Sequence, residues 1–570
     1  MNDHMAARGP DGDGEWYSPD GRVGLAHKRL AIIDTSETGG QPMQLAGDDG
    51  QPRLVITYNG EVYNFRALRD ELQSQGRTFT SESDTEVLLH LYDRDGPSMV
   101  RKLRGMFAIA IWDVQKQGLF LARDPFGIKP LYYADDGGTL RAASQVKALL
   151  AGGHIDTSPQ PAGHVGFYLF GYVPEPHTLY KYIKVLPSGS CLWIDTDGVG
   201  EPTQYFDVRT HLAGPQSGSD KSDVLPKLHA ALSDSVAHHL VSDVPVGVFL
   251  SAGLDSAIVT GLASEQSGTA LQTMTLQFDE LAGGVMDEAP LAEEIAYLYR
   301  TRHQTRNVNG AEFHRDMGHL FQSMDQPSID GANTYFVSKE AAAMGLKVAL
   351  SGLGGDELFG GYPSFRQVPR LVNSLGWMPG LAGLGKAFRL VSAPFLKRTT
   401  SPKYASLFEY GGSHAGAYLL RRGLYLPWEL PGVMDPDMAA EGWRDLRPMA
   451  RLKETVEGIF DDKARVSALE LTWYMRNQLL RDSDWAGMAH SLEIRTPLVD
   501  AQLFEEIAAL DASKQDMARA PSTPLPESVM NRPKTGFYIP VREWLVGEHP
   551  DYSKERGFRG WARYVHGQFA

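Results

Sequence analysis

Two short apolar runs in the second half of the chain each end in a loop of small residues, and this repeated pattern restricts the fold more than any other feature. Val244 to Leu250 leads into Ser251-Ala252-Gly253-Leu254-Asp255-Ser256, and Lys347 to Leu350 leads into a glycine-rich stretch from Ser351 to Tyr362. A helical pattern from Ala257 to Gln266 follows the first loop. Buried strand, loop and helix in series are typical of a parallel sheet with helices on both faces. We therefore predict an α/β domain whose two loops flank one crevice at the sheet edge.

The first loop has the chemistry of a phosphate site. We expect a helix to begin at or just after Ser256, and the unpaired backbone amides at its start would suit a pyrophosphate. Ser251 and Ser256 would add hydroxyl donors, and Asp255 is placed to hold a metal ion that bridges phosphate oxygens. Ala252 requires a negative φ, because alanine disfavours the left-handed region. Taken alone, the loop also fits an ordinary strand-to-helix turn.

The second loop favours the nucleotide interpretation over two unrelated turns. Its glycines allow the backbone to approach a ligand closely. Asp356 and Glu357 bring carboxylates to the same edge of the sheet. A nucleotide with a metal ion is the ligand that this combination predicts.

The first half of the chain has a different pattern. Short β-type runs with turns extend from about residue 20 to 205, and two helical stretches, Phe65 to Gln75 and Asp84 to Asp95, interrupt them. This order predicts a layered α+β domain. The polar stretch from Arg209 to Asp223 predicts a linker. We therefore divide the chain into a domain at 1–208, a linker at 209–224 and a second domain at 225–570, in which residues 365–465 are expected to be mostly helical. The strands predicted in the first domain are Arg53 to Tyr58, Phe107 to Trp112, Gly118 to Ala122 and Leu131 to Ala134.

Composition excludes several classes of function. A chain of 570 residues is too long for one ordinary core, and its net charge of −15 argues against a nucleic-acid partner. The single cysteine, Cys191, cannot form an internal disulfide. No apolar run is as long as a membrane span, and the start does not have the pattern of a signal peptide. We therefore expect a cytoplasmic protein without a membrane partner.

Several sequence blocks together resemble the class B, glutamine-hydrolysing asparagine synthetases. The resemblance extends from Arg8 to about Gly547. It implies an amino-terminal glutaminase-like layered domain of the Ntn-hydrolase type, here incomplete, followed by an ATP-pyrophosphatase domain with helical additions. A branch that amidates components of surface polysaccharides is also compatible with it. The blocks, besides the two loops, are Arg8-Gly9-Pro10-Asp11-Gly12, Arg29 to Asp34, Asn59 to Asn64, Ser83 to Glu86, Met488 to Asp500 and Arg532 to Phe537.

The resemblance assigns roles to residues of the second domain, with ATP and Mg²⁺ as cofactors. Asp255 and Asp356 would hold the magnesium ion and, with Lys534, act in catalysis. Leu250 and Leu276 would line the adenine pocket. His490 and Glu493 are read as a structural pair. The full set of nucleotide-binding residues would be Leu250, Ser251, Gly253, Leu254, Asp255, Ser256, Leu276, Ser351 and Gly352.

The same resemblance implies a glutamine site in the first domain. Arg29 would bind the α-carboxylate of glutamine through paired hydrogen bonds, and Asp84 would bind the α-amino group. Asn59 and Gly60 would form the oxyanion hole, and Glu61 would help to fix the substrate amine. The Asn59-Gly60 dipeptide also favours a hairpin turn, which is compatible with an oxyanion hole.

The nucleophile of the family is missing from the sequence given. The mature relatives begin with a cysteine, whereas this chain begins Met1-Asn2-Asp3-His4. Cys191 lies in an alternating, strand-like stretch and is read as a small apolar filler. Either Met1 is an internal methionine of a longer protein, which the retained glutamine-site residues favour, or the chain takes free ammonia or another amine. Without a thiolate there is no acyl-enzyme intermediate, so the chain as given is not expected to hydrolyse glutamine.

The function implied is an ATP-dependent ligase that activates a carboxylate as an acyl-adenylate and converts it to an amide with ammonia, from glutamine or free. Leu353 stands where asparagine synthetases carry an acidic residue near the acceptor, and Trp485 replaces a basic residue after Asp484. Because leucine can neither transfer a proton nor accept a hydrogen bond, aspartate or another carboxylate, such as a sugar uronic acid, could be the acceptor. A non-catalytic nucleotide-binding or regulatory homologue is the alternative of another class, and a homodimer is left open.

Overall fold

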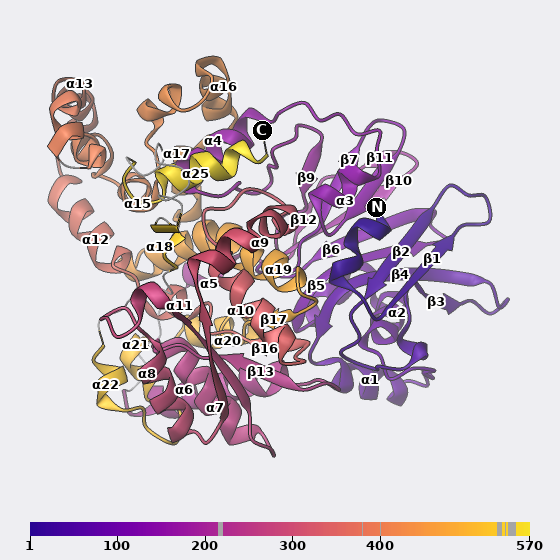
Figure 1. Ribbon diagram of the computed structural model, residues 1–570. Coiled ribbons are helices and arrows are strands. Elements are labelled where there is room, and N and C mark those ends of the chain that lie inside the picture. Colours follow the sequence, from indigo (N-terminus) through magenta and orange to yellow (C-terminus); the bar gives the residue numbers. More distant parts are fainter. Residues whose placement is uncertain are drawn as a thin grey trace.

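The computed structural model describes residues 1–214, 221–378, 380–399, 401–532, 539–541, 543–544 and 555–569. In Figure 1 an amino-terminal domain built on antiparallel strands lies to the right. A parallel sheet with its helices lies at the lower left, and a further layer of helices lies above it. The predicted order of an α+β domain before an α/β domain is confirmed.

A seven-stranded sheet organises the amino-terminal domain. Its long central strands pair antiparallel, with the order β11-β10-β6-β5-β4-β3 and β12 beside β10. Most of β5 is buried on both faces, because helices cover one side and a second, three-stranded sheet lies nearby. The strands of the domain are β1 (Gly12–Tyr17), β2 (Gly24–Arg29), β3 (Met43–Ala46), β4 (Pro52–Val62), β5 (Gly105–Asp113), β6 (Gly118–Arg123), β7 (Tyr132–Asp135), β8 (Leu140–Ala143), β9 (Ile183–Val185), β10 (Ser190–Asp195), β11 (Gly198–Val199) and β12 (Thr203–Gln204). The helices are η1 (Asn2–Arg8), η2 (Glu37–Gly39), α1 (Phe65–Ser74), α2 (Asp84–Asp95), η3 (Gly96–Lys102), α3 (Val146–Ala151), α4 (Pro161–Phe170) and α5 (Val208–Leu212).

The Asn59-Gly60 dipeptide lies inside β4 and not in a turn, so the hairpin interpretation is wrong. Asn59 pairs with Ala108 and Gly60 with Phe107. Gly60 has a φ of +147°, and a Cβ there would come within 2.0 Å of the carbonyl oxygen of Met106. Close approach of two strands, and not chain reversal, is therefore the reason for glycine at this position.

The second domain contains a five-stranded sheet in which every pairing is parallel, as predicted. Its order is β15-β14-β13-β16-β17, so the chain goes to opposite sides after β13 and places the ends of β13 and β16 together. Ligands bind at such a switch point in open α/β sheets. The strands are β13 (Val246–Phe249), β14 (Gln272–Phe278), β15 (Arg302–Val308), β16 (Val348–Leu350) and β17 (Glu493–Arg495).

One boundary prediction needs correction. Helix α7 (Leu254–Gln266) begins before Ser256, because Gly253 takes an extended conformation and forms the N-cap. Ala252 is absent from the residues with positive φ, as the sequence required. Parts of α5 and α6 (Lys221–His239) lie within the predicted linker, and its bounds stay a prediction. Residues 215–220 lie outside the described part.

Residues 365–465 are mostly helical, as predicted. Eleven residues, Glu470–Leu480, form the π-helix η7, a form often found at functional sites. The helices of the domain besides α6 and α7 are α8 (Ala289–Leu298), α9 (Gly310–Ser323), α10 (Ala332–Ala343), α11 (Gly355–Phe359), α12 (Ser364–Leu375), α13 (Leu381–Thr399), α14 (Leu407–Tyr410), α15 (His414–Arg422), α16 (Pro436–Leu446), α17 (Pro448–Thr455), α18 (Asp462–Leu469), α19 (Arg481–Met488), α20 (Ala501–Ala508), α21 (Lys514–Ala518), α22 (Glu527–Met530) and α25 (Arg559–Gly567), with the 3-10 turns η4 (Asp279–Leu281), η5 (Pro402–Ser406) and η6 (Pro427–Gly432).

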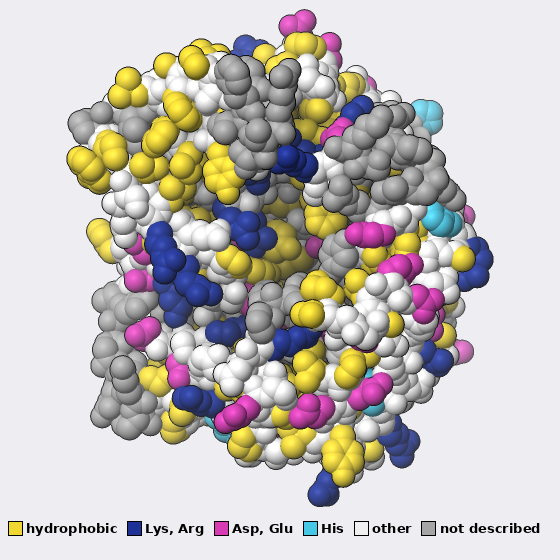
Figure 2. All heavy atoms as spheres, turned by 60° about the vertical axis from the view of Figure 1, so that its left-hand side comes forward, with side chains coloured by type: hydrophobic (Ala, Val, Ile, Leu, Met, Phe, Trp, Pro, Cys, Tyr) yellow, Lys and Arg dark blue, Asp and Glu magenta, His cyan; other side chains and the backbone are white. Residues whose placement is uncertain are grey.

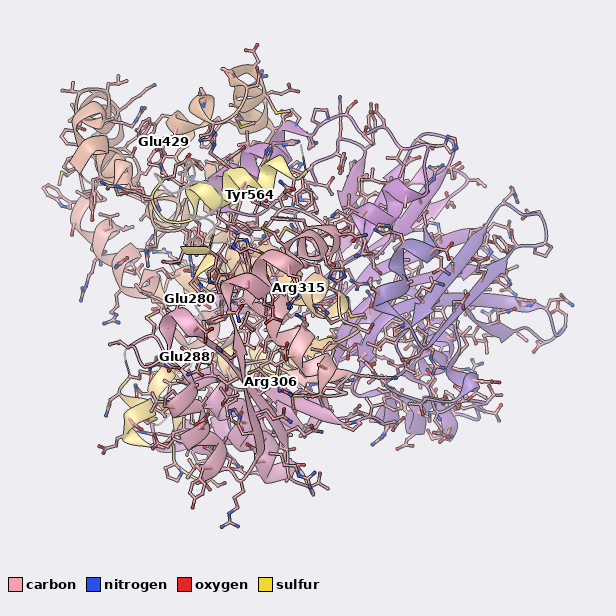
Figure 3. The ribbon with its side chains drawn as sticks, in the orientation of Figure 1. Glu280, Glu288, Arg306, Arg315, Glu429 and Tyr564 are labelled. Carbon is pink, nitrogen blue, oxygen red and sulfur yellow. The ribbon has the colours of Figure 1, made fainter. Side chains whose placement is uncertain are left out.

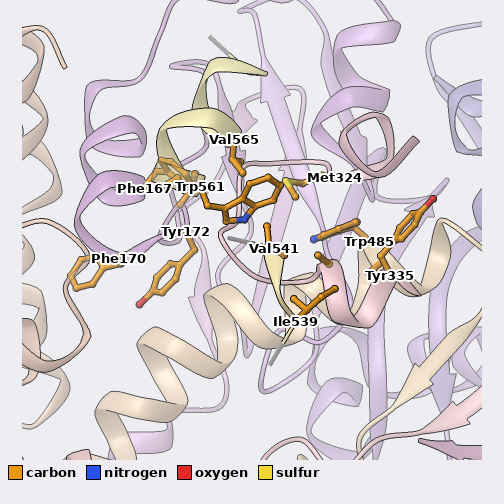
Figure 4. Packing of buried hydrophobic residues seen from close by; sticks show 14 of the residues in the cluster. Phe167, Phe170, Tyr172, Met324, Tyr335, Trp485, Ile539, Val541, Trp561 and Val565 are labelled. Carbon is orange, nitrogen blue, oxygen red and sulfur yellow. The ribbon is translucent and has the colours of Figure 1, made fainter. Parts of the chain in front are cut away.

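One hydrophobic cluster joins the two domains. Figure 4 shows Phe167 and Phe170 of α4 in the same cluster as Trp485 and Trp561 from the second domain. Helix α16 approaches α4 so closely that a Cβ on Gly442 would lie 2.2 Å from the carbonyl oxygen of Pro161. Helix α4 therefore belongs to the first domain by sequence and fills the core of the second.

The carboxyl-terminal helix α25 is fixed by charge as well as by apolar packing. Arg559 donates two hydrogen bonds, of 2.9 and 3.0 Å, to the carboxylate of Glu429, which Figure 3 labels in the upper left part of the molecule. His566 lies 2.9 Å from His164 of α4. No helix within the described ranges is both long enough and apolar enough to cross a bilayer.

Candidate functional site

The first loop closes on itself through its two serines. The hydroxyl of Ser256 accepts a hydrogen bond from the backbone N–H of Ser251 at 3.0 Å and lies 2.9 Å from the Ser251 hydroxyl. It also lies within donor distance of the carbonyl oxygens of Ser251 and Gly253. These contacts fix the conformation of the loop beside the start of α7, where the helix dipole favours an anion.

A cavity of about 570 Å³ lies over the ends of β13 and β16. The nucleotide-binding residues predicted from the sequence all line it, and so do both predicted metal ligands. The structure thus brings together Leu250, Ser251, Gly253, Leu254, Asp255, Ser256, Leu276, Ser351, Gly352 and Asp356.

Lys514 links the two acidic loops and was not expected from the sequence. Its ammonium contacts the carboxylate of Asp255 and lies 2.9 Å from that of Asp356. It comes from α21, far along the chain, and no local pattern marks it. The contact shows that the two carboxylates face one point in space.

The donor set of this point fits magnesium. Mg²⁺ in nucleotide sites is usually held by one or two carboxylates together with phosphate oxygens and water. Asp255 and Asp356 supply two carboxylates. No cluster of three or more candidate ligands occurs among the residues that the structure describes, so phosphate oxygens would complete the coordination.

Lys534, the third predicted catalytic residue, lies outside the described residues. Arg532, just before it, lines the cavity and forms an ion pair of 3.3 Å with Glu288. Figure 3 places Glu288 beside the parallel sheet, on the side of the cavity.

The far wall of the cavity is acidic. Leu353 lines it as predicted, and so do Asp330 and Asp482, which the sequence did not single out. The hydroxyl of Ser328 donates to Asp482 at 2.7 Å and accepts from the backbone N–H of Asp330 at 3.2 Å. Trp485 does not line the cavity: it is buried, and its indole N–H donates to Asp482 at 2.7 Å. Its influence on the site is therefore exerted through Asp482.

Burial and the neighbouring charge of Asp330 raise the pKa of Asp482 to about 8, from an ordinary value of 3.8. The folded protein therefore holds a proton that the unfolded chain has released between about pH 4 and about pH 8. Stability conferred by this proton is present at low pH and is lost as the pH rises through that window.

Asp482→Asn should flatten the pH dependence of stability. We expect the thermal midpoint of the wild-type protein to fall between pH 5 and 8, with up to about 1.4 kcal/mol of stability lost per pH unit, and the variant to lose clearly less. Thermal melts across this range measure the effect. Asp437→Asn, at an exposed position of α16, is the control. Parallel profiles for Asp482→Asn and the wild type would contradict the assignment.

The five predicted glutamine-site residues line a second cavity, of about 170 Å³, in the amino-terminal domain. They are Arg29, Asn59, Gly60, Glu61 and Asp84. The structure therefore brings the five residues together around one cavity, and their assignment to a glutamine site stays a prediction.

The polar groups of this cavity already have protein partners. Asp84, in the first turn of α2, accepts hydrogen bonds of 3.0 Å from the hydroxyl of Tyr58 and from the backbone N–H of Val62. Burial nevertheless raises its pKa. The guanidinium of Arg29 donates to the carbonyl oxygens of Asp34 and Ser36. These contacts orient the two side chains that would hold the ends of an amino acid.

Glu61 belongs to a buried charge cluster between the domains. We call Glu61, Lys129, Glu493 and Arg495 the interdomain charge cluster. Arg495 lies 2.8 Å from Glu493 and 3.6 Å from Glu61, and Lys129 lies 3.3 Å from Glu493. Burial, with the negative charge of Glu493, raises the pKa of Glu61 well above its ordinary value. The cluster joins β4 to β17, and three of its members, Glu61, Lys129 and Glu493, line the glutamine-side cavity.

A third, small cavity of about 10 Å³ lies between the two larger ones. Lys129 and Met488 line both it and the glutamine-side cavity. Ser483 and Ile494 line both it and the nucleotide cavity. The three cavities thus form a series through the domain interface, with a middle space the size of one water molecule.

Cys191 does not line the glutamine-side cavity. It lies on β10, faces a different cavity and is 3.6 Å from the carbonyl oxygen of Thr203. Burial raises the pKa of its thiol, which disfavours a thiolate. Its expected role as a filler fits this position.

Comparison with known proteins agrees with this geometry. A family model described as a glutamine amidotransferase domain matches residues 1–206, and one described as asparagine synthase matches residues 227–558. The two matches define a glutamine amidotransferase domain joined to a carbon–nitrogen ligase domain.

Individual relatives identify the family within this class of proteins. A putative glutamine-hydrolysing asparagine synthetase of Mycobacterium bovis is 34% identical over 561 residues, covering 95% of this chain and 83% of that one. Asparagine synthetase 1 of Bacillus subtilis is 33% identical and covers 96% and 84%. Asparagine synthetase B of Escherichia coli is 35% identical over 64% of this chain and 61% of its own. The chain belongs to the asparagine synthetase family.

Proposed function

We propose that the protein activates a carboxylate with ATP and converts it to an amide with ammonia. The observation that carries this proposal is the meeting of Asp255 and Asp356 at one point of a cavity that the predicted nucleotide residues line. The carboxylate oxygen would attack the α-phosphate, and pyrophosphate would leave. Ammonia would then attack the acyl carbon, and AMP would leave with the former carboxylate oxygen.

The residues of the cavity divide this work. Asp255 and Asp356 would hold a magnesium ion, which supplies neutralisation of the phosphate charge when bound. The amides at the start of α7 would hold the pyrophosphate. Leu250 and Leu276, both buried, would contact the adenine. The side chains thus position the reactants and exclude water.

The series of three cavities supports an internal source of ammonia. Ammonia is about the size of the water molecule that the middle cavity could hold. The glutamine-side cavity would release it, and the nucleotide cavity would consume it. Because Cys191 lines a different cavity, the described residues would bind glutamine without supplying a thiolate for its hydrolysis.

A carboxylate other than aspartate is the second candidate for the acceptor. Leu353, Asp330 and Asp482 carry no positive charge that could bind the second carboxylate of aspartate. The cations among the described lining residues, Lys514 and Arg532, are paired with carboxylates of the protein. The hydroxyl groups of a sugar uronic acid could instead donate hydrogen bonds to the two acidic side chains. Such an acid has a single carboxylate, which would be the one activated.

A panel of acids tests both proposals. We expect ATP–pyrophosphate exchange with at least one uronic acid, and amide and AMP formation with that acid and added ammonium chloride. Glutamine in place of ammonia is expected to give little product with the chain as given. Exchange should be measured with aspartate, glucuronate and galacturonate at equal concentrations.

Each outcome of the panel has a meaning. Exchange with aspartate alone would reject the uronic-acid candidate and leave the ligase proposal intact. Robust glutamate release from glutamine would contradict the inference about Cys191. If none of the acids raises AMP formation above the rate measured without an acceptor, the result would favour a non-catalytic nucleotide-binding homologue.

A further inference from the structure

Helix α13 leaves a hydrophobic stripe uncovered. Leu384, Phe388 and Val391 are spaced at i, i+4 and i+7, so they lie on one face of the helix. Leu384 is 71% exposed and Val391 is 72% exposed. Gly385 and Ala393, which lie off this face, are buried, and a Cβ on Gly385 would clash with the backbone of Glu409. The stripe therefore points away from the protein.

The end of α12 extends this surface. Trp377 follows the helix, is 73% exposed and fixes its ring by donating to the carbonyl oxygen of Ser374 at 3.0 Å. Leu390 is also largely exposed. We call Trp377, Leu384, Phe388, Leu390 and Val391 the α12–α13 surface. An exposed apolar group of this kind marks an interaction site.

The surface lies at an outer corner of the molecule. In Figure 1, α12 and α13 form the upper left, on the far side from the amino-terminal domain. Figure 2 turns that side forward and shows hydrophobic side chains gathered on its upper left. Because α12 and α13 form the left edge of the molecule in Figure 1, a flat partner could approach them from that side.

The charge of this segment is opposite to that of the whole chain. Residues 358–408 contain seven lysines and arginines and no aspartate or glutamate, in a chain of net charge −15. Arg366, Arg370 and Lys386 are exposed. Arg389 is paired with Glu409, which offsets its charge, whereas Lys403 donates to the carbonyl oxygen of Arg421 and keeps its charge.

We propose that the α12–α13 surface docks the protein on an anionic lipid bilayer. Exposed aromatic and aliphatic side chains combined with lysine and arginine are typical of helices that lie in the plane of a membrane interface. Tryptophan favours the same depth. In this arrangement the two helices would lie on the bilayer surface. Dissolved salt screens charges that are more than about 10 Å apart. The lipids would therefore respond to the positive charge near the α12–α13 surface more than to the negative charge elsewhere on the chain.

A second copy of the chain fits the surface less well. Docking two copies through this segment would bring the cations of both together, which costs free energy. Anionic lipid phosphates instead complement these cations. The charge pattern therefore selects the membrane.

Vesicle sedimentation tests the proposal without relying on turnover. The full chain is mixed with vesicles of phosphatidylcholine containing phosphatidylglycerol, or of phosphatidylcholine alone. We expect binding to the first kind, weakened by salt, and about tenfold weaker binding for Leu384→Asp/Val391→Asp. Tyr297→Asp/Phe460→Asp is the matched control, because both of its positions are strongly exposed and lie elsewhere.

The outcomes separate the alternatives. Both double variants should keep the wild-type melting temperature, because all four positions are exposed. The proposal is overturned if the wild type does not sediment with phosphatidylglycerol vesicles, or if the control variant loses as much binding as the α13 variant. It is also overturned if light scattering shows a dimer that only the α13 variant converts to a monomer.

Discussion

Asp356→Asn should abolish most of the ATP–pyrophosphate exchange, with an expected loss of about a thousandfold, or about 4 kcal/mol of transition-state stabilisation. The substitution removes one of the two carboxylates that meet at the ammonium of Lys514. An amide cannot neutralise magnesium as a carboxylate does, and the phosphate charge would be held less well. Exchange measured at saturating ATP and magnesium gives the loss directly.

The control for this variant is Asp437→Asn, which changes the same chemistry at an exposed position of α16. It should exchange at the wild-type rate. Magnesium titration adds a second readout, because Asp356→Asn should need a higher magnesium concentration for its remaining activity. Wild-type exchange in Asp356→Asn would remove this residue from the site.

Arg495→Met should lower the free energy of unfolding by about 3–5 kcal/mol, the usual cost of leaving a buried charge without its partner. Arg495 is fully buried and is the shared partner of Glu61 and Glu493. Methionine fills a similar volume but leaves two carboxylates facing only Lys129. Denaturant unfolding, followed by tryptophan fluorescence, measures the change.

Two comparisons separate charge from packing. Arg444→Met, at an exposed site on α16, should change the stability by no more than about 0.5 kcal/mol. Adding Glu493→Gln to Arg495→Met should recover part of the loss, because one unpaired carboxylate is then neutral. An equal loss in the single and double variants would show that packing, and not charge, explains the effect.

The sequence predicted those parts of the site that depend on local chain geometry. A buried strand followed by small residues predicts the loop at Ser251 to Ser256, because both features lie within a few residues. The edge shared by this loop and that of Asp356 follows from the rule for parallel sheets. The lining of both large cavities was predictable for the same reason, together with the family resemblance.

Contacts between distant segments could not be predicted in this way. Lys514 reaches Asp255 from α21, and Asp482 of α19 lies near Asp330, which belongs to the loop before α10. Neither contact can be recognised from the residue pattern of a single segment, because its two partners are far apart in the sequence. Asn59-Gly60 misled the local interpretation because the same dipeptide serves a turn and a tight strand pairing. The helix boundary at Leu254 depended on the conformation of one glycine, which sequence does not specify.

The position of helix α4 restricts the exchange of domains between this protein and its relatives by recombination. The helix follows the strands of the glutaminase half in the sequence, yet its aromatic side chains complete the interior of the ligase half. A transplanted glutaminase half would have to bring a matching α4. The backbone of α4 approaches Gly442 so closely that a side chain at this position would clash with it. The two halves are therefore expected to co-evolve as one inherited unit, and recombination between them would select against mismatched pairs.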